Sequence, residues 1–187
     1  MDNATSGDFT LSLSKDLLWQ STSRCIFLPM NPDLYPDFMA VALREAQLAF
    51  EKNEVPVGAV VVHESRVIGR GHNLTESLHD ATAHAEMIAL SAAFNSIGDW
   101  RLEDCYLFST LEPCIMCASA SVLSRVNTIV YGARDPKFGG CGSIMTIPTI
   151  EKLNHRCEIV GGVCEQEVAD LMKTFFQQVR KNKSKVN

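Results

Sequence analysis

The sequence contains no run of about 20 apolar residues, the length that a transmembrane helix requires. It also contains no internal repeat and no low-complexity tract. Basic residues number 17 and acidic residues 22, and the net charge of −5 argues against a broadly basic nucleic-acid binder. A local basic patch would still attract phosphates. The length of 187 residues and the ordinary apolar content of 46% indicate one soluble domain with its own core.

The cysteines also exclude a class of protein. Seven is an odd number, and no secretory apolar segment precedes them. A complete disulfide framework therefore fits poorly, and we expect a reducing compartment, the cytoplasm, together with a metal site. Five of the cysteines lack metal-like spacing and are interpreted as free thiols: Cys25, Cys105, Cys141, Cys157 and Cys164.

The two ends of the chain differ from its middle. Residues 1–34 are expected to form a disordered N-terminal extension, because residues 1–24 are rich in Ser and Thr. The acids within that stretch argue against a transit peptide. Residues 35–181 are expected to form the folded domain, and residues 182–187 a basic C-terminal tail.

Two short motifs carry the chemistry, His84-Ala85-Glu86 and Pro113-Cys114-Ile115-Met116-Cys117. They supply one imidazole, two thiolates and one spare carboxylate. Three protein ligands with an open fourth position are typical of catalytic zinc, whereas a structural zinc has four. The carboxylate of Glu86 is then available to move protons of an activated water. A buried core histidine and two buried apolar cysteines would explain each motif alone. The two motifs together, in this order, favour the metal site.

The hydrophobic pattern predicts an α/β fold with three α-β-α layers around one mixed five-stranded sheet. The expected helices span residues 36–53, 84–95, 114–124 and 164–181, and the expected strands span 55–62, 67–71, 105–110, 128–132 and 156–160. Residues 73–83 and 133–146 are expected to be loops. Both metal motifs then open helices, where the helix dipole favours anionic sulfur. These two helices must lie side by side to close a shared metal site.

With these motifs in place, the chain resembles the cytidine-deaminase-like superfamily, because H-x-E followed by P-C-x-x-C is the recognised signature of zinc nucleobase deaminases. Over residues 36–181 it is more closely similar to the bacterial tRNA adenosine deaminases. The matching segments are residues 55–60, 71–73, 79–86, 110–118, 131–135, 153–156 and 175–176. Ala81 departs from the family, which usually has proline there.

The resemblance implies one zinc ion per subunit, held by His84, Cys114 and Cys117, with Glu86 as the proton carrier. It implies a homodimer that converts the wobble adenosine of a tRNA anticodon stem-loop, that of tRNA-Arg with an ACG anticodon, to inosine. It also implies substrate contacts from Asn73, Ala85, Val57, Asp135, Lys137 and Phe175. Taken by themselves, these residues would be interpreted as turn, helix-start, loop and core positions.

Two other functions stay open at this level. The first is a deaminase of free cytidine, guanine or a related small molecule, which would use the same zinc chemistry. The amphipathic last helix and the basic run of Arg180, Lys181, Lys183 and Lys185 favour a polymer substrate instead. The second is a non-catalytic, zinc-stabilised binding module. It would need a fourth protein ligand, for which His72 and His79 are the nearest histidines, or the loss of Glu86.

Overall fold

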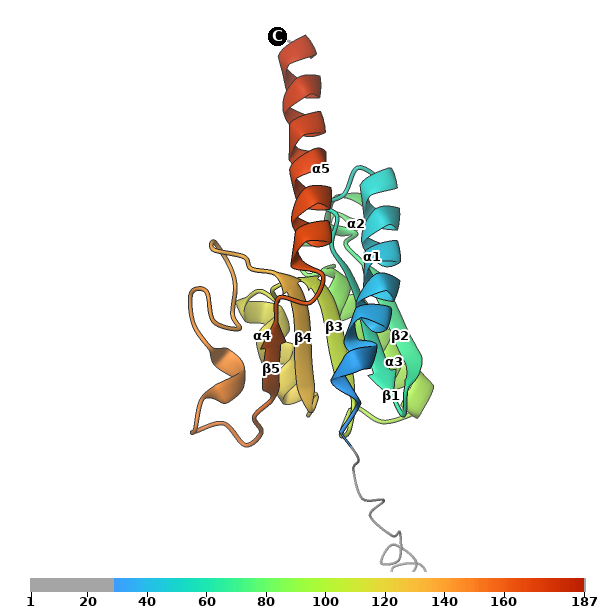
Figure 1. Cartoon of the computed structure of the whole chain (residues 1–187), viewed down its shortest axis with the longest axis vertical. Coiled ribbons are helices and arrows are strands. Elements are labelled where there is room, and N and C mark those ends of the chain that lie inside the picture. Colours follow the sequence, from blue (N-terminus) through green and yellow to red (C-terminus); the bar gives the residue numbers. More distant parts are fainter. Residues whose placement is uncertain (1–28, 187) are drawn as a thin grey trace, which may run out of the picture.

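Five strands form one mixed sheet in the order β2-β1-β3-β4-β5. The structure is a computed structural model, and it describes residues 29–186 (Figure 1). The strands are β1 (Gly58–His63), β2 (Arg66–His72), β3 (Tyr106–Leu111), β4 (Thr128–Ala133) and β5 (Glu158–Gly161). β1 pairs antiparallel with both β2 and β3, whereas β3, β4 and β5 run parallel. The expected mixed five-stranded sheet is therefore confirmed.

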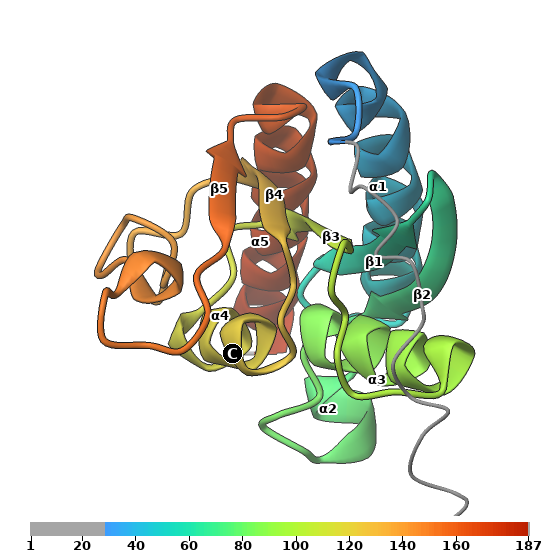
Figure 2. The same cartoon turned by 90° about the horizontal axis from the view of Figure 1, so that it is seen from below.

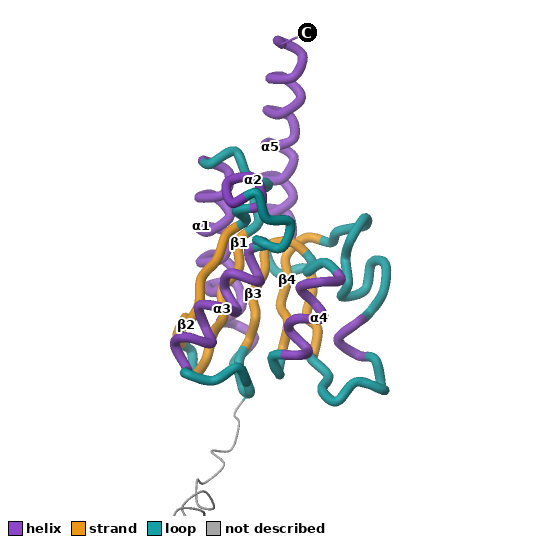
Figure 3. Tube along the Cα trace, turned by 180° about the vertical axis from the view of Figure 1, so that it is seen from behind, coloured by secondary structure: helices purple, strands orange, loops and turns teal. Residues whose placement is uncertain are grey.

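Helices cover both faces of this sheet (Figure 2). One face carries α1 (Tyr35–Glu51) and α5 (Glu165–Val186), and the other carries α3 (Ala85–Ile97) and α4 (Ile115–Leu123). Seen from behind, α3 and α4 lie side by side in front of the sheet (Figure 3). The short elements are α2 (Thr75–Leu78) and the 3-10 helices η1 (Pro32–Leu34) and η2 (Ile147–Thr149). The three-layer architecture is thus as expected.

Residues without bulky side chains set the distance between β2 and α3. A Cβ atom at Gly71 would lie 2.3 Å from the Ala85 carbonyl oxygen, and one at Gly69 would lie 2.2 Å from the Ala89 carbonyl oxygen. Such separations are far below van der Waals contact. The backbone of β2 therefore touches the backbone of α3, and this contact fixes the first turn of that helix.

The core on the α1 face is different in character. Phe108 of β3 is fully buried, and its ring centroid lies 5.6 Å from that of Tyr35 and 5.4 Å from that of Phe38. Aromatic pairs at such separations add to the stability that burial provides. Met30 is also buried on this face, and its backbone N–H donates to the Tyr106 hydroxyl at 2.8 Å.

Four differences from the expectations exceed two residues. β1 begins at Gly58 and not at residue 55, because Pro56 has no N–H to donate to a ladder. The expected loop 73–83 contains α2, and α5 continues past residue 181 to Val186. Residues 29–34, assigned to the extension, contain η1 and the buried Met30, so the folded part begins before residue 35. Residues 1–28, including Cys25, lie outside the described residues.

Among the residues that the structure describes, no helix combines the length and the apolar character needed to cross a membrane.

Candidate active site

The strand directions bring the predicted site residues to one edge of the sheet. β3 and β4 are parallel, so their carboxyl ends, Leu111 and Ala133, lie at the same edge. β1 runs the opposite way and begins there at Gly58, where it pairs with His72 at the end of β2. In sheets with parallel strands, ligands commonly bind outside these carboxyl ends. Segments distant in the sequence therefore converge on one place.

The three predicted metal ligands meet at this edge. His84 is the N-cap of α3 and Cys114 the N-cap of α4, and neither side chain caps its own helix. His84 Nδ1 lies 3.5 Å from Cys114 Sγ and 3.6 Å from Cys117 Sγ. All three ligand atoms lie within 4.8 Å of one another. As predicted, the first turns of α3 and α4 lie close together.

These separations match a tetrahedral zinc ion. Bond lengths of about 2.3 Å to sulfur and about 2.0–2.1 Å to nitrogen, at tetrahedral angles, put the nitrogen and sulfur atoms about 3.5–3.6 Å apart. One imidazole and two thiols are also a donor set that zinc prefers. The residues therefore fit the metal, and a zinc ion bound by three protein ligands supplies an activated water near neutral pH.

The two thiols and the imidazole shift one another's pKa values, so that an anionic Cys114 and a cationic His84 are favoured together. The hydrogen bond from Cys117 and, to a smaller extent, the nearby His84 lower the pKa of the Cys114 thiol to about 4, against the opposing effect of burial. The hydrogen bond with Cys114 raises the pKa of His84. The pKa of Cys117 is raised, first because its proton serves Cys114 and then because it is buried. The Cys114 sulfur at the start of α4 is therefore favoured as the thiolate, which is the form that binds a metal cation.

The carboxylate of Glu86 lies beneath the ligands in the first turn of α3. It is only 3% exposed, and Ser109 Oγ on β3 donates to its Oε1 at 3.2 Å. Burial raises the pKa of the Glu86 carboxyl above its ordinary value. A carboxyl whose pKa is moved toward neutrality is suited to both accepting and releasing protons.

A cavity of about 790 Å³ opens above these groups. This volume is within the usual range for small-molecule sites. Nearly all the predicted site residues line it: His84, Ala85, Glu86, Cys114, Val57, Asn73, Asp135 and Lys137. The third ligand, Cys117, is fully buried behind them. The structure therefore assembles in one cavity residues that span positions 57 to 137.

Phe175 is the predicted substrate contact that the structure does not bring into the cavity. It is 7% exposed and packs against Phe50 of α1, with ring centroids 5.7 Å apart. Its neighbour Phe176 is 41% exposed and lines the cavity together with Met172. Successive residues of a helix point about 100° apart, so only one of two adjacent phenylalanines can face the sheet. The aromatic ring that α5 contributes to the cavity wall is thus that of Phe176.

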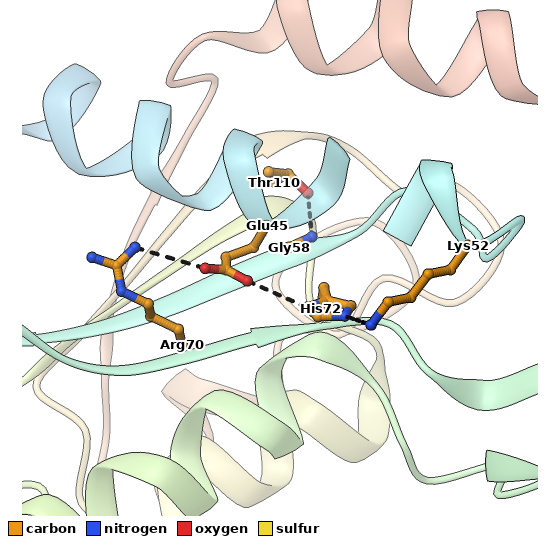
Figure 4. Close-up of polar contacts among 6 residues, drawn as sticks. All are labelled: Glu45, Lys52, Gly58, Arg70, His72 and Thr110. Atoms are coloured by element: carbon orange, nitrogen blue, oxygen red, sulfur yellow. Dashed lines mark hydrogen bonds and ion pairs between the residues drawn. The ribbon is translucent and has the colours of Figure 1, made fainter. Parts of the chain in front are cut away.

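No fourth protein ligand completes the metal group among residues 29–186. His72 faces away from it: its Nδ1 lies 3.3 Å from Glu45 Oε2 and its Nε2 lies 2.9 Å from Lys52 Nζ (Figure 4). Arg70 also pairs with Glu45, at 3.7 Å. His79 is exposed in a left-handed turn after α2. Among the described residues, the metal-binding group thus consists of three side chains.

Two buried carboxylates next to the cavity, those of Glu54 and Glu112, were not predicted from the sequence. Glu112 is 1% exposed and accepts hydrogen bonds from the backbone N–H groups of Asp135, Cys141 and Ser143 and from the Ser143 hydroxyl. It thereby holds the loop after β4 against the start of α4. Its position directly before Pro113 was visible in the sequence, but its partners lie 23 to 31 residues away.

Glu112→Gln is expected to destabilise the protein by about 3 kcal/mol at pH 7, because an amide would present N–H groups to N–H donors. Burial opposes ionisation of Glu112, but the hydrogen bonds from Ser143, Asp135 and Cys141 hold its pKa below the ordinary value. A lowered folded-state pKa stabilises above the unfolded pKa, and this stability is lost as pH falls through the folded pKa. The difference in melting temperature between parent and variant should therefore shrink from pH 7 to below pH 4. A difference independent of pH would contradict this account.

Comparison with known proteins agrees with this site. The family model for MafB19-like deaminases matches residues 36–180. The tRNA-specific adenosine deaminase of Bacillus subtilis (strain 168) is 47% identical over 146 residues, which cover 78% of this chain and 91% of that protein. The corresponding protein of Aquifex aeolicus (strain VF5) is 47% identical over 145 residues, covering 78% and 95%.

A solved structure from a study of A-to-I editing by tRNA:A34 deaminases at the wobble position of transfer RNA superposes with a TM-score of 0.70. It is 41% identical, and the match covers 72% of this chain and 98% of that one. The chain therefore belongs to the MafB19-like deaminase family and, with its His-Cys-Cys site, to the tRNA-specific adenosine deaminases within the cytidine-deaminase-like fold.

Proposed function

We propose that this enzyme converts the wobble adenosine of tRNA-Arg with an ACG anticodon to inosine, using one zinc ion per subunit. The observation that carries the proposal is the cavity in which His84, Glu86 and Cys114 meet Asn73, Val57 and the loop residues Asp135 and Lys137. The metal ligands and Glu86 lie at the bottom of this cavity, and its sides reach the protein surface. A cavity of this shape can receive a base that remains attached to a polymer.

In the proposed mechanism, each group on the chain has a distinct task. Glu86 takes a proton from the attacking water and delivers it to the purine ring nitrogen, while the water oxygen bonds to the amino-bearing carbon. Glu86 then moves the proton of the new hydroxyl group to the amino group, which leaves as ammonia. The Asn73 amide and the Ala85 backbone bind the extruded nucleoside, and Val57 packs against the base. The partly apolar enclosure excludes bulk water, which strengthens these polar contacts.

The surroundings of the cavity supply the proposed contacts to the rest of the RNA. Lys137 and Phe138 are exposed on the loop after β4, and Phe176 is exposed on α5. Beyond them, the last turns of α5 extend away from the sheet (Figure 1) and carry the exposed Arg180 and Lys181. Exposed aromatic rings can stack on unpaired bases, and basic side chains can contact phosphates.

The proposal includes a homodimer in a bacterial cytoplasm. Large apolar side chains are exposed on α4 and on the segment that follows β4: Leu123, Ile144, Met145, Ile150 and Leu153. Exposed apolar surface of this kind supports self-association. Light scattering across a dilution series tests the dimer.

The deciding experiment measures initial rates on a tRNA-Arg anticodon stem-loop with an ACG anticodon, on free adenosine and on free cytidine. We expect inosine from the stem-loop and almost no turnover of either nucleoside, because an unstacked loop base is easily extruded and the RNA supplies binding energy. The stem-loop with a GCG anticodon is the matched control. Faster turnover of cytidine than of the stem-loop would replace the proposal with a small-molecule deaminase.

Truncation after Val179 is expected to raise KM for the stem-loop more than it lowers kcat. It removes the basic run 180–185, whose phosphate contacts are the same in the ground and transition states. The truncated enzyme should also show a shallower fall of affinity with salt, since fewer counterions are released on binding. Titrations at two salt concentrations measure this slope. An unchanged KM and slope would show that the end of α5 does not contact the RNA.

A further inference from the structure

Glu54 is a fully buried carboxylate beside the cavity, with 0% of its surface exposed. It follows α1 and precedes Val55, which lines the cavity. Its Oε1 accepts from the Ser77 backbone N–H at 2.6 Å, and its Oε2 accepts from the Glu76 backbone N–H at 3.2 Å. No lysine or arginine forms a salt bridge with it among the described residues. A buried charge held by neutral hydrogen-bond donors is costly unless all of its partners stay in place.

The third partner of Glu54 is the side chain of Asn73. Asn73 Nδ2 donates to Glu54 Oε2 at 3.3 Å, and Asn73 Oδ1 accepts from Thr75 Oγ1 at 2.9 Å. Because a carboxylate has no hydrogen to donate, it must face the amide nitrogen and not the amide oxygen. Glu54 therefore fixes which way the Asn73 amide points. One N–H and one lone pair of that amide remain for a ligand in the cavity.

The same carboxylate anchors the segment that carries Asn73. The backbone N–H groups of Glu76 and Ser77 belong to the first turn of α2, so Glu54 satisfies groups that a helix start leaves unpaired. The Asn73 backbone N–H donates to the Val57 carbonyl at 3.0 Å, and the next residue donates to the Ala83 carbonyl, also at 3.0 Å. Ala83 directly precedes the metal ligand His84. The orientation of Asn73 is thus tied to the cavity wall on one side and to the metal site on the other.

We propose that Glu54 is a positioning residue for deamination, which acts by holding the Asn73 amide in the orientation that binds the nucleoside. This rests on the proposed function, because it gives Asn73 its contact with the substrate. The role requires a carboxylate. Three N–H donors converge on Glu54, and glutamine would replace one acceptor oxygen with an NH2 group that repels them. In Glu54→Gln, the Asn73 amide is expected to turn over and present the wrong group to the substrate.

The test is a double-mutant cycle with Glu54→Gln, Asn73→Ala and the double variant, each with full zinc, assayed on the ACG stem-loop. Glu54→Gln alone is expected to lower kcat about 10- to 100-fold, as is usual for the partners of functional side chains. KM should change less than about threefold, because the RNA contacts lie elsewhere. In the Asn73→Ala background, the same substitution should change kcat less than about threefold. Glu45→Gln, which removes a carboxylate of α1 that pairs with Arg70 and His72 (Figure 4), should match the parent.

A purely structural role predicts a different pattern. The two single effects on kcat would then multiply in the double variant, or Glu54→Gln would match the parent, and either result would overturn the proposal. If Glu54→Gln does not yield folded protein, the cycle is run with Glu54→Asp, which keeps the charge but shortens its reach. The rates of the parent enzyme on the stem-loop and on cytidine test the substrate assignment separately from the role of Glu54. If the parent prefers cytidine, the tRNA assignment fails, and the cycle is run on cytidine, where the same coupling decides the role of Glu54.

Discussion

Glu86→Gln is expected to reduce inosine formation on the order of a thousandfold while it leaves the fold and the zinc content at the parental level. Glutamine has almost the same shape as glutamate and can still accept from Ser109 Oγ, so the packing beneath the metal ligands is preserved. An amide cannot accept a proton from water and release it to the purine. The loss should therefore fall on kcat and leave stem-loop binding nearly unchanged.

The measurements are zinc per chain, melting temperature and single-turnover inosine formation. Glu51→Gln is the matched control, since it makes the same substitution on an exposed turn of α1. Rates of the variant within tenfold of the parent, with zinc retained, would show that another group moves the protons. A variant that loses zinc would instead assign Glu86 a role in holding the metal.

Cys114→Ala is expected to lose zinc and stability together. The substitution leaves His84 and Cys117, and two protein ligands hold zinc much more weakly than three. Zinc that binds only the folded protein stabilises it, so its loss lowers the free energy of unfolding. We expect zinc content after dialysis to fall roughly tenfold or more, with a clearly lower melting temperature that added zinc restores only in part.

Cys157→Ala provides the control for this experiment. Cys157 is a buried free thiol on the described chain, distant from the ligand set in sequence and not part of it. Its replacement should cost about 1 kcal/mol of packing and leave the zinc content unchanged. Parental zinc content in Cys114→Ala would require a different set of ligands.

The fold was predictable from the sequence wherever a pattern is local. Helical stripes and apolar runs located all four long helices and all five strands. Between the first two strands, Glu64 and Ser65 form the hairpin turn, and both have positive φ. The short helix α2 was missed, because four residues carry no periodic pattern and its start is capped by Glu54 from another part of the chain.

The site residues were also predictable only where they belong to a local sequence pattern. The three ligands and Glu86 lie within two short motifs, so their spacing alone indicated the chemistry. Glu54 and Glu112 could not be identified, because their partners are backbone N–H groups that only the folded chain brings near. Choosing between Phe175 and Phe176 required the rotation of α5 about its axis, which is set by the contact with Phe50.

The glycines of β1 and β2 make the sheet mechanically stiff near the site. Where β2 meets α3, backbone rests on backbone at Gly69 and Gly71, and no side chain there can change its rotamer to absorb a displacement. A displacement of β2 would therefore displace the first turn of α3, where Glu86 lies. The α1 face has a contact of the same kind at Gly58, the start of β1, where a Cβ atom would lie 2.1 Å from the Ala42 carbonyl oxygen. Glycines thus hold the sheet closely against a helix on each face, and the contact with α3 gives the reacting groups a rigid support.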